Sequence, residues 1–357
     1  MVKGRQRDIR NITRDGLEEW AASQGLQPFR GRQIFKWIWS RRPAGFNDFS
    51  DISKELRAKL QRSFFLYDLN PISRQESRDG TIKWGFELED GNIIETVLIP
   101  EKDHNTLCIS TQAGCALGCR FCMTARMGLR RGLKASEIAG QALSVIREVP
   151  KWKRPRNIVF MGMGEPLANF GQLIRAIEIL TDDLGLNFSN RRITVSTSGI
   201  VPKILELGYR MDVGLAISLH ATTDQVRSEL MPINRRYPLQ HLLEACRRYN
   251  LAKRRRITFE YLMLRGVNDL QEDAHRLTKL LNGIPSKVNL IPFNECPDLP
   301  FQPSEEKNIL RFQEILKQAN LTTIIRKSKG QDIMAACGQL NSHIKKRGRM
   351  REETLYL

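Results

Sequence analysis

Long apolar runs are absent from this 357-residue sequence. No stretch reaches the about 18 uninterrupted apolar residues that a transmembrane helix requires. The basic start of the chain, MVKGRQRDIR, also lacks the apolar segment of a secretory signal peptide. The sequence therefore predicts a cytoplasmic protein without a membrane partner. Its hydrophobic content of 41% is sufficient for one large core and a smaller accessory domain.

Acidic residues are scarce relative to basic ones, since 39 Asp and Glu stand against 57 Lys and Arg, for a formal charge of +18. Such an excess favours a polyanionic partner over a surface that is merely basic, because like charges repel one another. The basic residues are not gathered on one apolar-backed helix, so a membrane surface is not favoured. Their spread suits a large folded RNA. The clusters are Arg41-Arg42, Arg130-Arg131, Arg191-Arg192 and the segments 253–256 and 345–351.

Cysteines are few and odd in number, which argues against a framework of structural disulfides in a reducing compartment. Metal binding or redox chemistry is therefore the expectation for some of them. Three stand together in the run CALGCRFC, with C-x3-C-x2-C spacing. The full set is Cys108, Cys115, Cys119, Cys122, Cys246, Cys296 and Cys337.

Four segments follow from the local sequence patterns. Residues 1–68 carry helical patterns such as FRGRQIFKWIWSRR and form a predicted N-terminal helical accessory domain, which we expect to engage RNA. Residues 69–104 change to alternating strand patterns around a turn at Asp90-Gly91, which predicts a β-hairpin extension. Residues 105–340 form the predicted core, and residues 341–357 form a basic tail.

The core segment alternates short apolar runs with helical patterns, which predicts six βα units and an α/β fold with a parallel sheet, open or barrel-like. A run at 322–327 is a candidate for one more strand. In a barrel of this kind, chemistry gathers at the carboxyl ends of the strands. The six strand-like runs are 106–111, 157–164, 192–199, 213–220, 257–264 and 287–293.

The cysteine run follows the first of these strands, at Cys115, Cys119 and Cys122. Three thiolates on one compact loop can bind three irons of a 4Fe–4S cluster and leave the fourth iron without a protein ligand. That open iron can chelate the amino and carboxylate groups of S-adenosylmethionine and pass it an electron. The alternative is a zinc site completed by a fourth ligand such as Cys108, although zinc sites more often use paired CxxC hooks.

Polar or glycine-rich residues also end the later strands. In the run GMGEP, Gly164 lets the backbone approach a ligand closely, and Glu165 offers a carboxylate to the methionyl ammonium group. The ordinary interpretations are a βα turn for this run, helix caps for hydroxyl and amide residues, and a packed histidine for His220. The further candidates for binding S-adenosylmethionine are Ser196, Ser218, Leu219, His220 and Asn294.

With these motifs, the sequence resembles the RlmN/Cfr family of radical-SAM enzymes. Within that family it is most similar to the RlmN-type dual-specificity adenine-C2 methyltransferases of 23S ribosomal RNA and transfer RNA. The resemblance covers nearly the whole chain, through FRGRQIFKWIW, IETVLIP, STQAGCALGCRFCMTA, FMGMGEPLAN, ITVSTSGI, AISLHA, MPINRRYP, VNLIPFN and AACGQL. It implies a partial (β/α)6 radical-SAM barrel, with a 4Fe–4S cluster and S-adenosylmethionine as cofactors.

The resemblance also implies a reaction that uses two molecules of S-adenosylmethionine. One methylates a cysteine that corresponds to Cys337, and the other yields a 5′-deoxyadenosyl radical. This radical takes a hydrogen from the cysteine's methyl group, and the resulting methylene radical adds to C2 of the adenine. Glu95 would remove the C2 proton, Cys108 would release the product by forming a disulfide with Cys337, and Met161 corresponds to a family methionine near the site. From the residues alone, Cys108 would be a packed thiol and Glu95 a surface residue.

Two other functions stay open at this point. Relatives of the Cfr type methylate C8 of the same adenine, and the runs RSELMPINRRYP and FMGMGEPLAN resemble them too. A non-catalytic RNA-binding protein with a structural metal is the second alternative. For the enzyme we expect 23S ribosomal RNA and transfer RNA as partners, flavodoxin with its reductase as the electron donor, and a monomer.

Overall fold

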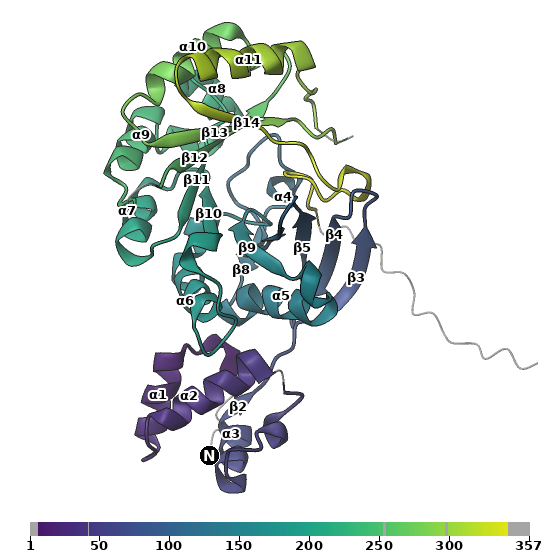
Figure 1. Cartoon of the computed structure of the whole chain (residues 1–357), viewed down its shortest axis with the longest axis vertical. Helices are drawn as coiled ribbons and strands as arrows, with labels where there is room; N and C mark the ends of the chain where they lie inside the picture. The colour runs from purple at the N-terminus through teal and green to yellow at the C-terminus, as the bar shows by residue number, and fades with distance from the viewer. Residues whose placement is uncertain (1–5, 42, 253–254, 297–298, 342–357) are drawn as a thin grey trace, which may run out of the picture.

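The computed structural model describes residues 6–41, 43–252, 255–296 and 299–341. A small helical unit at the N-terminus lies below a large α/β unit that is built on one ten-stranded sheet (Figure 1). Most of the predicted basic tail, residues 342–357, lies outside the described residues, as do positions 42, 253 and 254 of the basic clusters. No helix within the described ranges is long and apolar enough to cross a membrane.

The described residues of the N-terminal unit form three α-helices and three shorter helical turns, in the region where helical patterns predict a helical domain. Thr13 and Ser53 start two of them, because their hydroxyls accept hydrogen bonds from the Gly16 and Leu56 amides at 3.3 Å each. The helices bury Trp39 completely, and a short parallel pair of strands joins the start of the unit to its end. The elements are β1 (Arg7–Asp8), η1 (Ile9–Asn11), α1 (Arg14–Ser23), α2 (Phe29–Lys36), η2 (Trp37–Arg41), η3 (Phe46–Asp48), α3 (Lys54–Ser63) and β2 (Phe64–Phe65).

The ten-stranded sheet has the order β14-β13-β12-β11-β10-β9-β6-β5-β4-β3. The strands β6 and β9 to β14 are parallel, which confirms the predicted partial barrel and its extra strand at 322–327. The predicted hairpin, β4 with β5, continues the same sheet antiparallel beyond β6, and β3 adds an exposed edge that the sequence pattern does not reveal. The strands are β3 (Pro71–Glu76), β4 (Ile82–Glu87), β5 (Ile93–Pro100), β6 (Asn105–Cys108), β9 (Pro155–Phe160), β10 (Ile193–Thr197), β11 (Gly214–Ser218), β12 (Ile257–Met263), β13 (Ser286–Pro292) and β14 (Thr322–Ile325).

Helices follow the parallel strands and cover the outer face of the sheet (Figure 1). The sequence patterns do not reveal two of them: α7 carries a proline and a glycine in VPKILELGYR, and α8 has only seven residues, too few to establish a helical period. The helices are α5 (Ala135–Glu148), α6 (Phe170–Thr181), α7 (Val201–Arg210), α8 (Asp224–Leu230), α9 (Leu239–Arg248), α10 (Gln271–Leu280) and α11 (Glu306–Gln318). This arrangement places the carboxyl ends of the parallel strands at one edge of the sheet.

Candidate active site

The cysteine run forms a loop between two short antiparallel strands, β7 (Gln112–Gly114) and β8 (Leu129–Gly132), with the one-turn helix α4 (Met123–Arg126) inside it. Gly114 makes the loop's entry possible: its φ of 77° lies in the left-handed region, and a Cβ there would lie 1.8 Å from the Gly128 carbonyl oxygen. The amide of Cys115 donates to the same carbonyl at 3.1 Å. The two strands therefore bring the three cysteines together at the end of β6.

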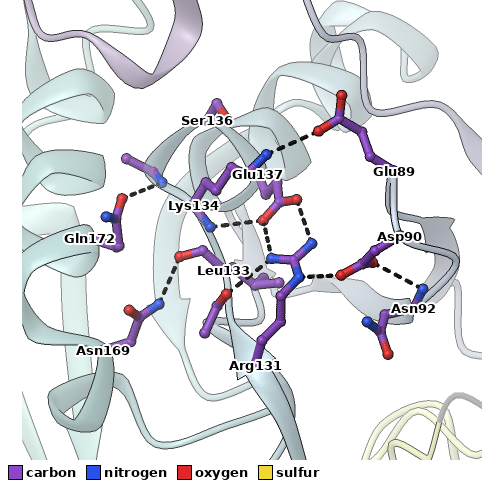
Figure 2. Close-up of polar contacts among 12 residues, drawn as sticks. Glu89, Asp90, Asn92, Arg131, Leu133, Lys134, Ser136, Glu137, Asn169 and Gln172 are labelled. Carbon is purple, nitrogen blue, oxygen red and sulfur yellow. Dashed lines mark hydrogen bonds and ion pairs between the residues drawn. The ribbon is translucent and has the colours of Figure 1, made fainter. Parts of the chain in front are cut away.

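A polar network holds the exit strand of this loop in place (Figure 2). Arg131, on β8, donates to both carboxylate oxygens of the buried Glu137, at 2.7 and 2.8 Å, and also pairs with Asp90 in the β4–β5 turn. Next to it, the Lys134 ammonium group lies 3.0 Å from the carboxylate of Glu89. The loop is thereby fastened to the antiparallel extension on one side and to the start of α5 on the other.

One cavity brings together ten of the fourteen predicted site residues. Its walls come from the cysteine loop, from the ends of β9, β10 and β11, and from a segment near the C-terminus. The predicted residues that line it are Cys115, Cys119, Cys122, Met161, Gly164, Glu165, Ser196, Ser218, His220 and Cys337.

The three loop cysteines fit an iron–sulfur cluster better than a single metal ion. Burial raises the pKa of Cys115 to about 11, and it also raises the pKa values of Cys119 and Cys122, so these thiols are neutral at pH 7 and would release their protons when metal binds. In the described part of the chain, no three His, Cys, Asp or Glu side chains converge as ligands of one ion would. A zinc ion needs all its ligands at about 2.0–2.3 Å. In a 4Fe–4S cluster, by contrast, each thiolate binds a different iron.

Glu165 is a buried carboxylate that the GMGEP turn holds at the cavity wall. Its two oxygens accept hydrogen bonds from the Leu167 amide at 3.0 Å and from the Ser198 amide at 2.8 Å, while burial raises its pKa. Gly164 lies directly before it with a φ of 99°, and a Cβ there would lie 2.5 Å from the Cβ of Gln112. The turn therefore packs against the entry of the cysteine loop, and only glycine fits this position.

Leu219, His220 and Asn294 differ in how they meet the cavity. The side chain of Leu219 is buried in the core, so only its backbone is available to a ligand. His220 lines the cavity, accepts a hydrogen bond from the Leu262 amide at 3.0 Å, and has a pKa that burial lowers to about 3, so it is neutral at pH 7. Asn294 is not among the lining residues, but its amide nitrogen lies 3.4 Å from the Cys337 carbonyl oxygen.

Cys337 reaches the cavity because the segment around it is tied to the cysteine loop. The Gly338 carbonyl accepts a hydrogen bond from the Met123 amide at 2.8 Å, and the Thr124 hydroxyl donates to the Leu340 carbonyl at 2.6 Å. Cys337 and Cys122 therefore share one cavity although they are far apart in the sequence. The thiol of Cys337 is exposed, unlike those of Cys115 and Cys119.

Cys108 and Glu95 lie behind the cavity wall, on the neighbouring strands β6 and β5. Burial and the charge of Cys337 together raise the pKa of Cys108 to about 12, although the Arg326 guanidinium opposes both effects. Glu95 is buried, with Lys83 Nζ at 3.1 Å from one oxygen and the Asn341 amide donating to the other at 2.9 Å. Glu95 is therefore not the surface residue that its strand pattern alone predicts.

The sequence patterns do not reveal two charged residues that line the cavity, or a third that supports its wall. Arg326, just after β14, is the only Lys or Arg among the described lining residues, and its Nη1 lies 3.9 Å from the Met161 sulfur. Glu260 lines the cavity from β12, and a glutamate inside the apolar run ITFEYLM is a signal that could have revealed it. Arg227 is completely buried and donates to the Ser198 and Ser218 carbonyls at 2.8 and 3.1 Å, which joins the ends of β10 and β11.

Comparison with known proteins identifies the family of this site. Residues 109–278 match the family described as the radical SAM superfamily, and residues 7–66 match the ribosomal RNA large subunit methyltransferase N-terminal domain. The dual-specificity RNA methyltransferase RlmN of Geotalea uraniireducens is 50% identical over 95% of this chain and 98% of its own. The chain belongs to the RlmN family.

Other RlmN relatives and a solved structure agree with this assignment. The RlmN of Geobacter sulfurreducens is 50% identical over 94% of this chain and 92% of its own. The crystal structure of a radical SAM methyltransferase from Sphaerobacter thermophilus superposes with a TM-score of 0.87 and 44% identity, covering 94% of this chain and 99% of that one. The predicted RlmN/Cfr family, radical-SAM methyltransferase class and barrel are therefore confirmed.

Proposed function

We propose that this protein methylates C2 of an adenine in 23S ribosomal RNA, and in transfer RNA, through a methylated cysteine. The position of Cys337 carries the proposal, because its exposed thiol lines the same cavity as the three cysteines of the loop. The RlmN relatives are named dual-specificity RNA methyltransferases, and the formal charge of +18 suits an RNA substrate. We further propose a cytoplasmic monomer that receives electrons from flavodoxin and its reductase.

The cofactors of this reaction would be a 4Fe–4S cluster and S-adenosylmethionine. Cys115, Cys119 and Cys122 would hold the cluster. When bound, the cluster supplies the electron that cleaves one molecule of S-adenosylmethionine, while a second molecule supplies the methyl group. The groups that would bind S-adenosylmethionine are Gly164, Glu165, Ser196, Ser218, the backbone of Leu219, His220 and Asn294, the last through its contact with the Cys337 segment.

The remaining steps, which are methyl transfer to sulfur, proton removal and product release, are assigned to side chains of this protein. Cys337 loses its proton, and its sulfur accepts the methyl group. Cys108 later attacks the Cys337 sulfur: the disulfide forms, the bond between that sulfur and the transferred carbon breaks, and the carbon leaves as the methyl group of the RNA after taking up a proton. The charge of Cys337 contributes to the raised pKa of Cys108, which supports their closeness. Met161 and Arg326 border the same region. Glu95 is the proposed base, and its ion pair with Lys83 has to open before its carboxylate reaches the cavity.

Mass spectrometry of nuclease-digested RNA tests the regiochemistry. Target RNA incubated with reconstituted enzyme, S-adenosylmethionine and reductant should contain 2-methyladenosine. A product that is only 8-methyladenosine, the Cfr-type modification, would refute C2 methylation. An anaerobic reconstitution tests the enzyme class separately: failure to bind iron and sulfide, or to release 5′-deoxyadenosine on reduction, would favour a non-catalytic metal-containing RNA-binding protein.

A further inference from the structure

Two arginine side chains are completely buried in the described part of the chain, Arg10 and Arg227. Arg10 has a carboxylate partner, since its Nη1 lies 2.6 Å from Asp68. Arg227, on α8, forms no ion pair with any described Asp or Glu, and its three guanidinium nitrogens donate to neutral oxygens instead. A buried charge is costly without a counter-charge, so Arg227 indicates an anion that the described residues do not supply. The neutral acceptors are the carbonyls of Leu219 at 3.1 Å, Ser198 at 2.8 Å and Ser218 at 3.1 Å, and the side-chain oxygen of Asn234 at 2.9 Å.

Asp224 is the carboxylate joined to this network, but it lies at the surface. Its side chain is exposed, and the amide of Asn234 stands between the two charges. Asn234 donates to Asp224 Oδ1 at 2.9 Å and accepts from Arg227 Nη1 at 2.9 Å. Water screens an exposed carboxylate, so Asp224 offsets only part of the buried charge. Burial lowers the pKa of Arg227 to about 10, and the guanidinium therefore stays protonated at pH 7.

Helix α8 brings the charge of Arg227 to the cysteine loop. The Arg120 amide, in the loop, donates to the carbonyl of Leu230 at the end of α8 at 3.0 Å. Cys119 and Leu230 belong to the same small cluster of apolar side chains. Burial and the neighbouring negative charges raise the pKa of Cys119, whereas the charge of Arg227 lowers it. The guanidinium is therefore close enough to act on a thiol that would bind iron.

We propose that Arg227 is the counter-charge of the iron–sulfur cluster and raises its reduction potential. The inference rests on the proposed function, because the cluster belongs to it. A 4Fe–4S core with three thiolates carries a net negative charge, which increases when the core gains one electron from its reductant. A fixed cation nearby stabilises the reduced form more than the oxidised form, so reduction becomes easier. No bond or proton moves in this step. Arg227 does not line the cavity, and it is thus a positioning residue that acts through the cysteine loop.

A purely structural role is the alternative, because the same hydrogen bonds join the ends of β10 and β11. A neutral amide could donate to two of these carbonyls, and its burial would cost far less than the burial of a charge. A guanidinium at this position therefore favours an electrostatic role over hydrogen bonding alone. Cys119 is the iron ligand on which this charge acts, and the cluster would be the anion present there.

The reduction potential of the cluster tests the proposal. Reconstituted protein without S-adenosylmethionine is titrated with dithionite, and the reduced cluster is followed by electron paramagnetic resonance. In Arg227→Met, the ratio of reduced to oxidised cluster at a fixed potential should fall by about tenfold or more, which corresponds to a midpoint lower by about 59 mV. Arg227→Lys keeps the charge but not the forked hydrogen bonds, and its ratio should stay within about twofold of the wild type. Arg10→Met is the matched control: it loses an equally buried arginine and should keep the wild-type midpoint.

A second variant keeps the guanidinium and covers the case in which Arg227→Met does not fold. The exchange Asp224→Asn with Asn234→Asp moves the carboxylate from the surface to the acceptor of Arg227 Nη1 without a change in net charge. It should also lower the midpoint, because the cation then has its counter-charge within the protein, whereas Asp224→Asn alone should not.

Two results would overturn the proposal. One is a wild-type midpoint in the exchange variant and in any Arg227→Met protein that folds. The other is an equal fall in Arg227→Lys and Arg227→Met, which would assign Arg227 to hydrogen bonding alone. Wild-type protein that binds no iron and sulfide would instead refute the proposed function. A wild-type cluster that is reduced reversibly, with a midpoint that none of these variants shifts, would refute only the role of Arg227.

Discussion

Replacing Arg131 with methionine should destabilise the protein by about 3 kcal/mol. The change keeps most of the apolar stem but removes the guanidinium from Glu137, whose side chain is 1% exposed. Of the hydrogen bonds to the Glu137 carboxylate in the described structure, the one from the Lys134 amide, at 2.8 Å, then remains. Breaking a buried pair costs about 3–5 kcal/mol, and we take the lower end because Arg131 is 27% exposed. At about 2.1 cal/mol/K per residue, this corresponds to a fall in Tm of about 4 °C.

Thermal unfolding of cluster-free protein, followed by circular dichroism, measures this effect. Lys134→Met is the matched control, since the pair between Lys134 and Glu89 is exposed on both sides and should contribute at most about 1 kcal/mol. Adding Glu137→Gln to the Arg131 variant should recover part of the lost Tm, because it removes the unpaired buried charge. Equal shifts for the Arg131 and Lys134 variants, or no recovery in the double variant, would refute this account of the network.

Three further predictions concern single residues in and behind the cavity. Cys337→Ala should retain iron and the release of 5′-deoxyadenosine but yield no methylated RNA by mass spectrometry; any methylated product would exclude Cys337 as the methyl carrier. Cys108→Ala should accumulate a covalent protein–RNA adduct, visible as a shifted band on a denaturing gel, and its absence would leave Cys108 a packing residue. The pKa of His220 is about 3 in the folded state and 6.5 ordinarily, so its contribution to stability is present above pH 6.5 and lost as the pH falls below it. Between pH 7 and pH 5, cluster-free wild-type protein should therefore lose more Tm than His220→Asn, whose amide oxygen can still accept from Leu262; parallel losses would contradict this.

The sequence predicts the parallel part of the fold well, because buried parallel strands are continuous apolar runs. Each of the six runs overlaps a strand, and the weaker run at 322–327 contains β14. Local sequence patterns are less informative where tertiary packing decides whether a segment forms a strand or a helix. The edge strand β3 pairs only with β4 and is mostly exposed, and α7 begins at a valine and a proline whose helical state depends on packing of Ile204 and Leu207.

The candidate site likewise combines features that a local sequence pattern contains with others that depend on long-range contacts. The spacing of the loop cysteines and their place after β6 are local features, so residues alone identify them. The approach of Cys337 depends on backbone hydrogen bonds from Met123 and Thr124 to a segment more than 200 residues later, which no local pattern contains. Arg326 is likewise brought to the cavity by the last strand of the sheet. For Glu95 the local pattern is misleading, because the alternation in its strand predicts an exposed side chain, whereas the side chain is buried in the structure.

The two hydrogen bonds that join the cysteine loop to the segment around Cys337 also bear on how the protein is assembled. We call these two bonds the clasp. Gly338 and Leu340, which bond to Met123 and Thr124, are synthesised more than 200 residues after them. Domains fold as units during translation, from the N-terminal side first. A nascent chain on the ribosome therefore presents Cys115, Cys119 and Cys122 before the clasp exists. Under the proposed function, iron and sulfide would have their widest access in that interval, and the bonds from Met123 and Thr124 would bring the Cys337 thiol into place last.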